Sequence, residues 1–150
     1  MPTNTKQIRR LDDTSPSVQT HLGIVQGVID RMASNSTQCK AWCITIVSAV
    51  LVVVADKGKP DFAWIALFPS LLFFALDAYY LTLEKAFRAS YNIFIDKVHK
   101  GILEPEDLYS VLPAGKMENH KKNALKSFSV WGFYLGLMAL VAIARYVVLP

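Results

Sequence analysis

Long apolar stretches dominate the pattern of this chain. Three of them occupy residues 41–55, 62–76 and 128–144, the last with a tail at 146–149, and none of the three contains Lys, Arg, Asp or Glu. About 20 mostly apolar helical residues cross the bilayer core, which is about 30 Å thick. A soluble chain of 150 residues could not bury three such stretches. The pattern therefore predicts an integral membrane protein.

We expect an all-α fold in one membrane domain, 1–150. Residues 17–55 form a helix with the first span, and residues 61–100 form a helix with the second span. A cytosolic connector at 102–126 leads to the third span at 127–149. The turn between Asp56 and Asp61 is so short that it can only join antiparallel neighbours, which makes the first two spans a hairpin. Asp61 could cap the second helix, and Pro69 could bend it.

Charge placement predicts the orientation. The chain is 53% hydrophobic and 19% charged, and its net charge of +4 is concentrated before the first span and between the second and third. By the positive-inside rule, the N-terminus and residues 83–126 are cytoplasmic and the turn is outside. Three spans would also put Pro150 outside, where Arg145 can extend. No signal-peptide pattern precedes the first span, so we expect a multi-pass protein of the cell inner membrane. The alternative has two spans, with residues 128–149 lying on or re-entering the membrane.

A heptad pattern precedes the first span. Ser15 and Pro16 predict the start of a helix. The heptad seam that follows consists of Val18, Leu22, Val25, Ile29 and Met32. Its rhythm continues through Ser36, Cys39, Cys43, Ile46, Val50 and Val53. Off the seam, Gly23 and Gly27 would let another backbone approach closely. Both packing against a neighbouring helix and assembly of a homo-oligomer fit this seam.

The helix of the second span continues into the cytosol. No glycine or proline interrupts residues 77–100, and one face stays apolar at Leu83, Phe87, Tyr91, Phe94, Ile95 and Val98. The hairpin brings this face beside residues 18–32. We therefore expect residues 18–32 and 83–98 to pack into a cytosolic stalk about 20 to 30 Å long.

Polar and aromatic residues form a stripe along the second helix. Its pore or gating candidates are Asp77, Tyr80, Glu84 and Arg88, spaced three or four apart, with Phe73 above them. By helical rise Asp77 lies roughly 22 Å from the outer end of the span, near the inner headgroups rather than mid-bilayer. A carboxylate within the membrane is a functional candidate by default. Asp77 is either a structural acid, solvated or bonded to a tyrosine, or a residue that lines a pore. In the second case Phe68, Leu72 and Phe73 would form an apolar constriction that closes by dewetting.

A resemblance to known proteins covers residues 18–112, where a membrane hairpin with long cytosolic helices is expected. Its most specific part is the aromatic and acidic segment that leaves the second span, Asp77-Ala78-Tyr79-Tyr80-Leu81-Thr82-Leu83-Glu84-Lys85-Ala86-Phe87-Arg88. The chain resembles the SLATT-type small membrane effectors of prokaryotic antiphage conflict systems. It is similar also to small membrane accessory proteins of RNA-targeting CRISPR systems. The resemblance implies homo-oligomers that perturb the membrane after a signal from a cytosolic sensor. The third span departs from the two-span plan of those families.

Enzyme and metal chemistry find little support in the sequence. His21, His99 and His120 are scattered and are expected at the surface, and no phosphate loop or Gly-x-Ser-x-Gly motif is present. Cys39 and Cys43 share a helix face without nearby His or carboxylate residues, which favours apolar packing over a metal or redox site. We expect no catalytic residue and no cofactor. The basic residues 116–126 favour anionic membrane lipid over nucleic acid.

The connector is predicted to contain a turn and a short helix that begins at Pro105. Leu108, Val111 and Leu112 need cover, either from a cytosolic partner or from the protein's own stalk. Two functions follow from these patterns. The first is an oligomeric, pore-forming membrane effector in antiphage defence. The alternative is a non-conducting membrane anchor or scaffold for a soluble partner. A small transporter is less favoured, because no inverted repeat or broken helix pair is visible.

Overall fold

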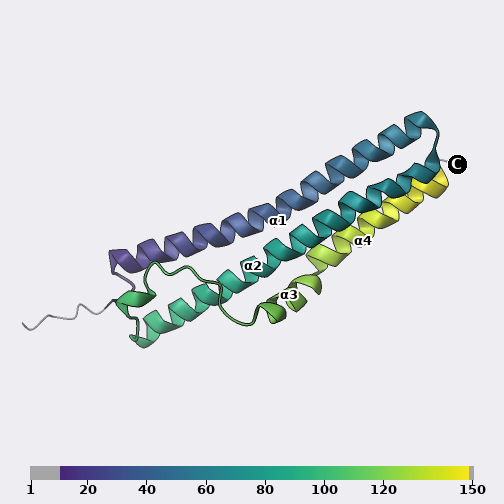
Figure 1. Ribbon diagram of the computed structural model, residues 1–150. Coiled ribbons are helices and arrows are strands. Elements are labelled where there is room, and N and C mark those ends of the chain that lie inside the picture. Colours follow the sequence, from purple (N-terminus) through teal and green to yellow (C-terminus); the bar gives the residue numbers. More distant parts are fainter. Residues whose placement is uncertain (1–10, 149–150) are drawn as a thin grey trace, which may run out of the picture.

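The computed structural model describes residues 11–148, and every regular element in that part is helical (Figure 1). The long helices are α1 (Pro16–Lys57), α2 (Leu67–Lys100) and α4 (Phe128–Ile143). The short elements are η1 (Pro60–Ala66), η2 (Pro105–Asp107), α3 (Met117–Leu125) and a π-helical turn, η3 (Ala144–Val148). The expected all-α class with three long apolar helices is confirmed.

Three helical segments are long and apolar enough to cross a membrane: Pro16–Lys57, Pro60–Lys100 and Phe128–Val147. The third contains 20 residues, which is about 30 Å of helix and matches the hydrocarbon core. In Figure 1, α1 and α2 run antiparallel, and α4 lies along the half of α2 nearest their shared turn. This architecture is consistent with a multi-pass membrane protein.

Glycines end the two longest helices. Gly58 and Gly101 follow α1 and α2 in the left-handed conformation, with φ of 58° and 65°. Their amides bond to carbonyls of the last helical turn, as in other glycine-capped helices. At the start of α1, Pro16 is the first helical residue, but the Ser15 hydroxyl donates to Asp12 Oδ1 at 2.9 Å and does not cap the helix. Hydrogen bonds from Thr14 and Ser15 hold the pKa of Asp12 below its usual value.

The second span begins as a 3₁₀ helix. An α-helix through Pro69 would place its ring against the carbonyl of Ile65, and Pro69 has no N–H to donate. The chain instead adopts the tighter 3₁₀ form in η1 and continues as α-helix from Leu67. Pro69 therefore lies in the first turn of α2. The segment expected to be helical over residues 61–100 is thus helical as Pro60–Lys100, with 3₁₀ geometry up to Ala66.

The buried face of α1 follows the period of a straight helix. Its buried residues are Val18, His21, Val25, Ile29, Ser36, Cys39, Cys43, Val47 and Val54. A strict heptad predicted Ile46 and Val53 on this face, but they are 38% and 59% exposed. A straight α-helix has 3.6 residues per turn, so positions repeated every 3.5 residues rotate gradually around its axis. One position further along, Val47 and Val54 therefore take the buried places of Ile46 and Val53.

The end of α4 is joined to the turn between the first two spans. Arg145 Nη2 contacts Asp61 Oδ1 at 2.5 Å, and the rings of Trp64 and Tyr146 meet edge to face at 6.2 Å. Asp61 makes no capping hydrogen bond to its own helix, so its expected capping role is replaced by this ion pair. The C-terminal end of α4 accordingly lies at the same end of the molecule as the turn between α1 and α2 (Figure 1).

Candidate functional site

A fully buried carboxylate joins α1 to α2. Asp77 of α2 is 0% exposed. Its Oδ1 accepts a hydrogen bond of 2.5 Å from Ser36 Oγ, and its Oδ2 lies 2.6 Å from Lys40 Nζ. The second contact is an ion pair by distance, although its angles are not those of a hydrogen bond. Lys40 Nζ also donates to Ser36 Oγ at 3.3 Å, so the three side chains form one closed polar cluster.

The hairpin register brings these residues together. Ser36 and Lys40 are four positions apart and share one face of α1. In an antiparallel pair of helices with equal rise, residues at equal distances from the turn lie side by side. Asp77 is about as far beyond Gly58 as Ser36 and Lys40 are before it. Sequence reasoning missed both partners, although this symmetry about the turn would have indicated them.

The third span adds a buried tyrosine to this region. Tyr134 of α4 is 1% exposed, and its ring packs edge to face on Phe74 and Phe133, with centroids 5.5 and 4.8 Å away. Its hydroxyl has no hydrogen-bond partner among residues 11–148. Tyr134 thus places a buried hydroxyl of α4 in the apolar core that also contains Cys43 and Ala78.

The cysteines lie on the same face of α1 as Ser36. Cys39 and Cys43 are both buried and reduced, and Cys43 belongs to the apolar core with Val47 and Tyr134. Within the described part of the chain, no group of three or more His, Cys, Asp or Glu side chains is placed to hold a metal ion. The chemistry of this region is that of a charge pair held in an apolar setting.

The predicted stripe on α2 does not form one surface in a single copy. Asp77 points into the contact with α1, while Phe73 is half-buried against the apolar core. Tyr80 is half-buried and meets the Tyr79 ring at 5.6 Å. The predicted ion pair is present at 2.8 Å between Glu84, whose side chain is 13% exposed, and Arg88, whose side chain is 58% exposed.

The heptad seam is covered within one copy. Val18, Val25 and Ile29 are buried, and Leu22 and Met32 are half-buried. Gly23 and Gly27 are exposed, and a Cβ added at either would meet nothing within 4 Å. The close backbone approach expected at these glycines is therefore absent in the described residues of a single copy. A role of the seam in assembly stays a prediction.

A second polar site fastens the connector to the stalk. His21 was expected at the surface, but it is 2% exposed, and its Nδ1 accepts a 2.9 Å hydrogen bond from the Tyr109 amide. Its ring lies 4.2 Å from that of Phe94. Nearby, Lys97 Nζ donates to Asp107 Oδ1 at 2.7 Å. The connector thus covers part of its own stalk.

Burial and charge act on this site in opposite directions. Burial lowers the pKa of His21, and the nearby Asp107 carboxylate partly offsets this effect. The hydrogen bond from Lys97 in turn lowers the pKa of Asp107. Only the neutral His21 ring can accept a hydrogen bond from the Tyr109 N–H. The observed hydrogen bond and the lowered pKa therefore both favour the neutral form of His21.

Part of the connector remains uncovered. Ile102, Tyr109 and Leu112 are 59%, 58% and 69% exposed. The segment between α2 and α3, to which these residues belong, lies at the end of the molecule away from the turn between α1 and α2 (Figure 1). Large apolar side chains in a segment outside the candidate spans are available for contact with another molecule.

Comparison of the chain with models of protein families, with characterised proteins and with solved structures found no match.

Proposed function

We propose that the protein is an oligomeric, pore-forming membrane effector that acts in antiphage defence downstream of a cytosolic sensor. The observation that carries the proposal is the buried cluster of Ser36, Lys40 and Asp77, which joins two candidate spans next to the stalk. Ionisable residues at membrane depth commonly mark an ion path or a switch. The resemblance of residues 77–88 to SLATT-type effectors points in the same direction.

The ion pair offers two states with a physical reason for each. While α1 and α2 stay together, Lys40 and Asp77 neutralise each other in a contact that buries the carboxylate. If the helices separate, both charges require water, because an unpaired buried charge is strongly unfavourable. A displacement of the stalk that parts the helices would therefore favour hydration beside Asp77. In this proposal the closed pair is the resting state of the effector.

The conducting path in this proposal runs between copies. One copy with three spans leaves no room for an aqueous channel, and Phe68 and Leu72 are 76% and 51% exposed on its surface. These side chains would meet those of other copies and form the apolar constriction. Glu84 and Arg88 would lie at its cytoplasmic mouth. The partners of the protein would be membrane lipid, further copies and a cytosolic sensor, in the inner membrane with a cytoplasmic N-terminus.

Membrane potential in infected cells tests the proposal. Cells that express the parent should depolarise during infection by a phage against which the protein protects. Asp77→Asn and Lys40→Gln should change the onset or extent of depolarisation. Asp96→Asn is the matched control, because Asp96 forms an exposed ion pair with Lys100. The pore would be refuted if the parent protected cells without depolarising them and Asp77→Asn protected equally well.

The alternative is a non-conducting membrane anchor or scaffold, and the exposed connector residues favour it. Ile102, Tyr109 and Leu112 form an uncovered apolar set outside the candidate spans. An anchor would use such residues to hold a soluble partner. Tyr109→Ser with Leu112→Ser should then abolish protection, while Asp77→Asn protects as well as the parent. Loss of protection in Asp77→Asn alone would favour the effector.

A further inference from the structure

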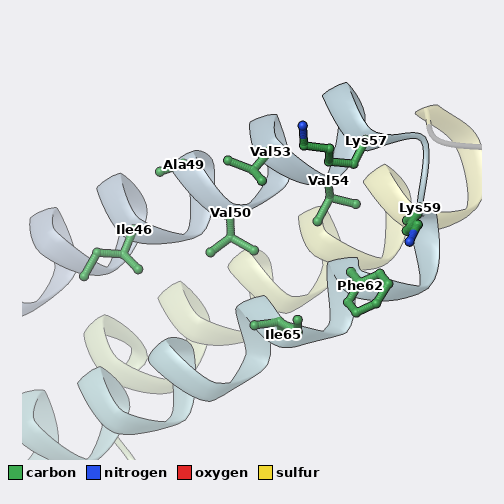
Figure 2. A pocket seen from close by; sticks show the side chains of 9 residues that line it. All are labelled: Ile46, Ala49, Val50, Val53, Val54, Lys57, Lys59, Phe62 and Ile65. Carbon is green, nitrogen blue, oxygen red and sulfur yellow. The ribbon is translucent and has the colours of Figure 1, made fainter.

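An apolar groove opens between α1 and the start of the second span, at the turn end of the molecule. It has a volume of about 590 Å³. Figure 2 shows Val50 and Val54 pointing from α1 towards Phe62 and Ile65 of η1. The groove is lined by Ile46, Ala49, Val50, Val53, Val54, Lys57, Lys59, Phe62 and Ile65. No residue of α4 is in this lining, so the third span does not cover the groove.

The length of the groove matches one leaflet of a bilayer. Its α1 residues extend from Ile46 to Lys57, a rise of about 16 Å. One leaflet contributes about 15 Å of the hydrocarbon core. In a protein with three candidate spans, an open apolar groove of this length in the second half of α1 lies where lipid acyl chains are the surrounding solvent.

Both polar residues of the lining lie at the turn end of the groove. Lys57 and Lys59 flank Gly58, beyond the apolar residues (Figure 2). Lys57 lies 3.6 Å from Asp56, but both side chains are at least 70% exposed, so this pair is weak. Lys59 has no carboxylate partner among residues 11–148. Asp61, the other acid of the turn, is paired with Arg145.

The groove thus has an apolar wall the length of a leaflet and two cations at the level of the headgroups. From this arrangement we infer that it binds an acidic phospholipid, with an acyl chain along Val50 and Val54 and the phosphate between Lys57 and Lys59. Because η1 is a narrow 3₁₀ helix, space remains between it and α1. In this inference the acyl chain of the lipid occupies that space. The bound lipid completes the contact between the first two spans at this end of the molecule.

Native mass spectrometry of the full-length protein in detergent tests the site. Dioleoyl phosphatidylglycerol and dioleoyl phosphatidylcholine are added separately as probes. The parent should retain one phosphatidylglycerol more tightly than phosphatidylcholine. In Lys57→Gln with Lys59→Gln this preference should fall about fivefold for each lysine removed, which corresponds to about 1 kcal/mol per cation. Arg31→Gln with Lys100→Gln, at exposed positions of α1 and α2 far from the groove, is the control and should keep the parent's preference.

A second variant tests the groove itself. Ala49→Phe places a ring in the groove and should reduce retention of both lipids, while inorganic phosphate should not compete with phosphatidylglycerol. Equal retention of the two lipids by the parent, or an unchanged preference in the double lysine variant, would overturn the inference. The inference would also be overturned if the parent bound neither lipid and the Ala49→Phe variant had a lower subunit number than the parent. That result would mean that a second copy of the protein fills the groove.

Discussion

The Lys40 ammonium on α1 lies 2.6 Å from the Asp77 carboxylate on α2, in a contact that excludes the carboxylate from solvent completely. Such a pair contributes little net stability compared with apolar residues of similar size, because both charges must lose their hydration. Breaking it is a different matter, since one charge is then left buried alone. This asymmetry makes the contribution of the pair measurable.

Removing one member of the pair should destabilise the helical hairpin. Lys40→Met leaves Asp77 uncompensated, and we expect a loss of about 3 kcal/mol in the free energy of unfolding in detergent. Lys40→Met combined with Asp77→Leu should recover most of this loss. The matched control is Lys100→Met with Asp96→Leu, an exposed pair with a contribution of about 0 to 1 kcal/mol. Equal stability of Lys40→Met and the parent would contradict the buried pair.

The connector should loosen as the pH falls. The pKa of His21 is lowered in the folded state, so below about pH 6.5, the usual pKa of histidine, the unfolded state binds the proton more readily. The associated stability is fully present above that pH and is lost as the pH falls towards the folded-state pKa. Protonation of Nδ1 also removes the acceptor for the Tyr109 amide.

Hydrogen exchange measures this change directly. Between pH 7.5 and 5.5, after correction for intrinsic rates, exchange at Tyr109 should accelerate in the parent. His21→Gln keeps an acceptor that does not titrate and should remove the pH dependence. Asp107, Lys97 and Glu106 also line this region, but carboxylates and lysines ordinarily titrate outside this interval, unlike histidine. His99→Gln, at an exposed position of α2, should behave as the parent does.

The stalk should depend on one face of α1. Ile29 is 2% exposed, whereas Ile24 on the same helix is 43% exposed. Ile29→Asp should therefore destabilise the stalk by at least about 3 kcal/mol and increase protease cleavage there. Ile24→Asp should leave the stalk of each copy intact. If Ile24→Asp lowers the subunit number in light scattering while Ile29→Asp does not, the outer face of α1 makes the assembly contact.

The turn between the first two spans and the end of the third span should be labelled from the same side of the membrane. The ion pair of Asp61 with Arg145 requires Lys59 and Val147 to share a membrane face. If Phe128–Val147 crosses the membrane, Glu118 lies on the opposite face. Single cysteines at these three exposed positions can be treated with a membrane-impermeant maleimide. The positive-inside rule predicts labelling of Lys59→Cys and Val147→Cys from outside. Labelling of Val147→Cys and Glu118→Cys from the same side would contradict the ion pair in the membrane.

Cysteine at Gly115 is a poor choice for this experiment. Gly115 has a φ of 84°, and a Cβ there would lie 2.7 Å from His120 Nε2. A substitution would strain the backbone and displace the histidine, whose Nε2 lies 2.9 Å from the Ala114 carbonyl oxygen. Glu118 avoids both problems, because it is exposed in the first turn of α3.

Helix ends and spans were predictable because their causes are local. Pro16 starts α1, and Gly58 and Gly101 end α1 and α2, since each residue has a backbone preference that needs no distant partner. Apolar stretches long enough for a bilayer are likewise a property of neighbouring residues. The i, i+4 pair of Glu84 with Arg88 also depends on a single helix.

The sequence by itself thus determined the helical class, the three candidate spans and the hairpin. Only the tertiary structure decided the partner of Asp77, because Ser36 and Lys40 become its neighbours through the register of two helices. It also decided the burial of His21 under the connector and the choice of Val47 and Val54 over Ile46 and Val53. The first two features depend on which distant segments meet, namely the two arms of the hairpin and the connector with its stalk. The third depends on the small difference between 3.5 and 3.6 residues per turn, which accumulates along a long helix and changes which side chains face its neighbour.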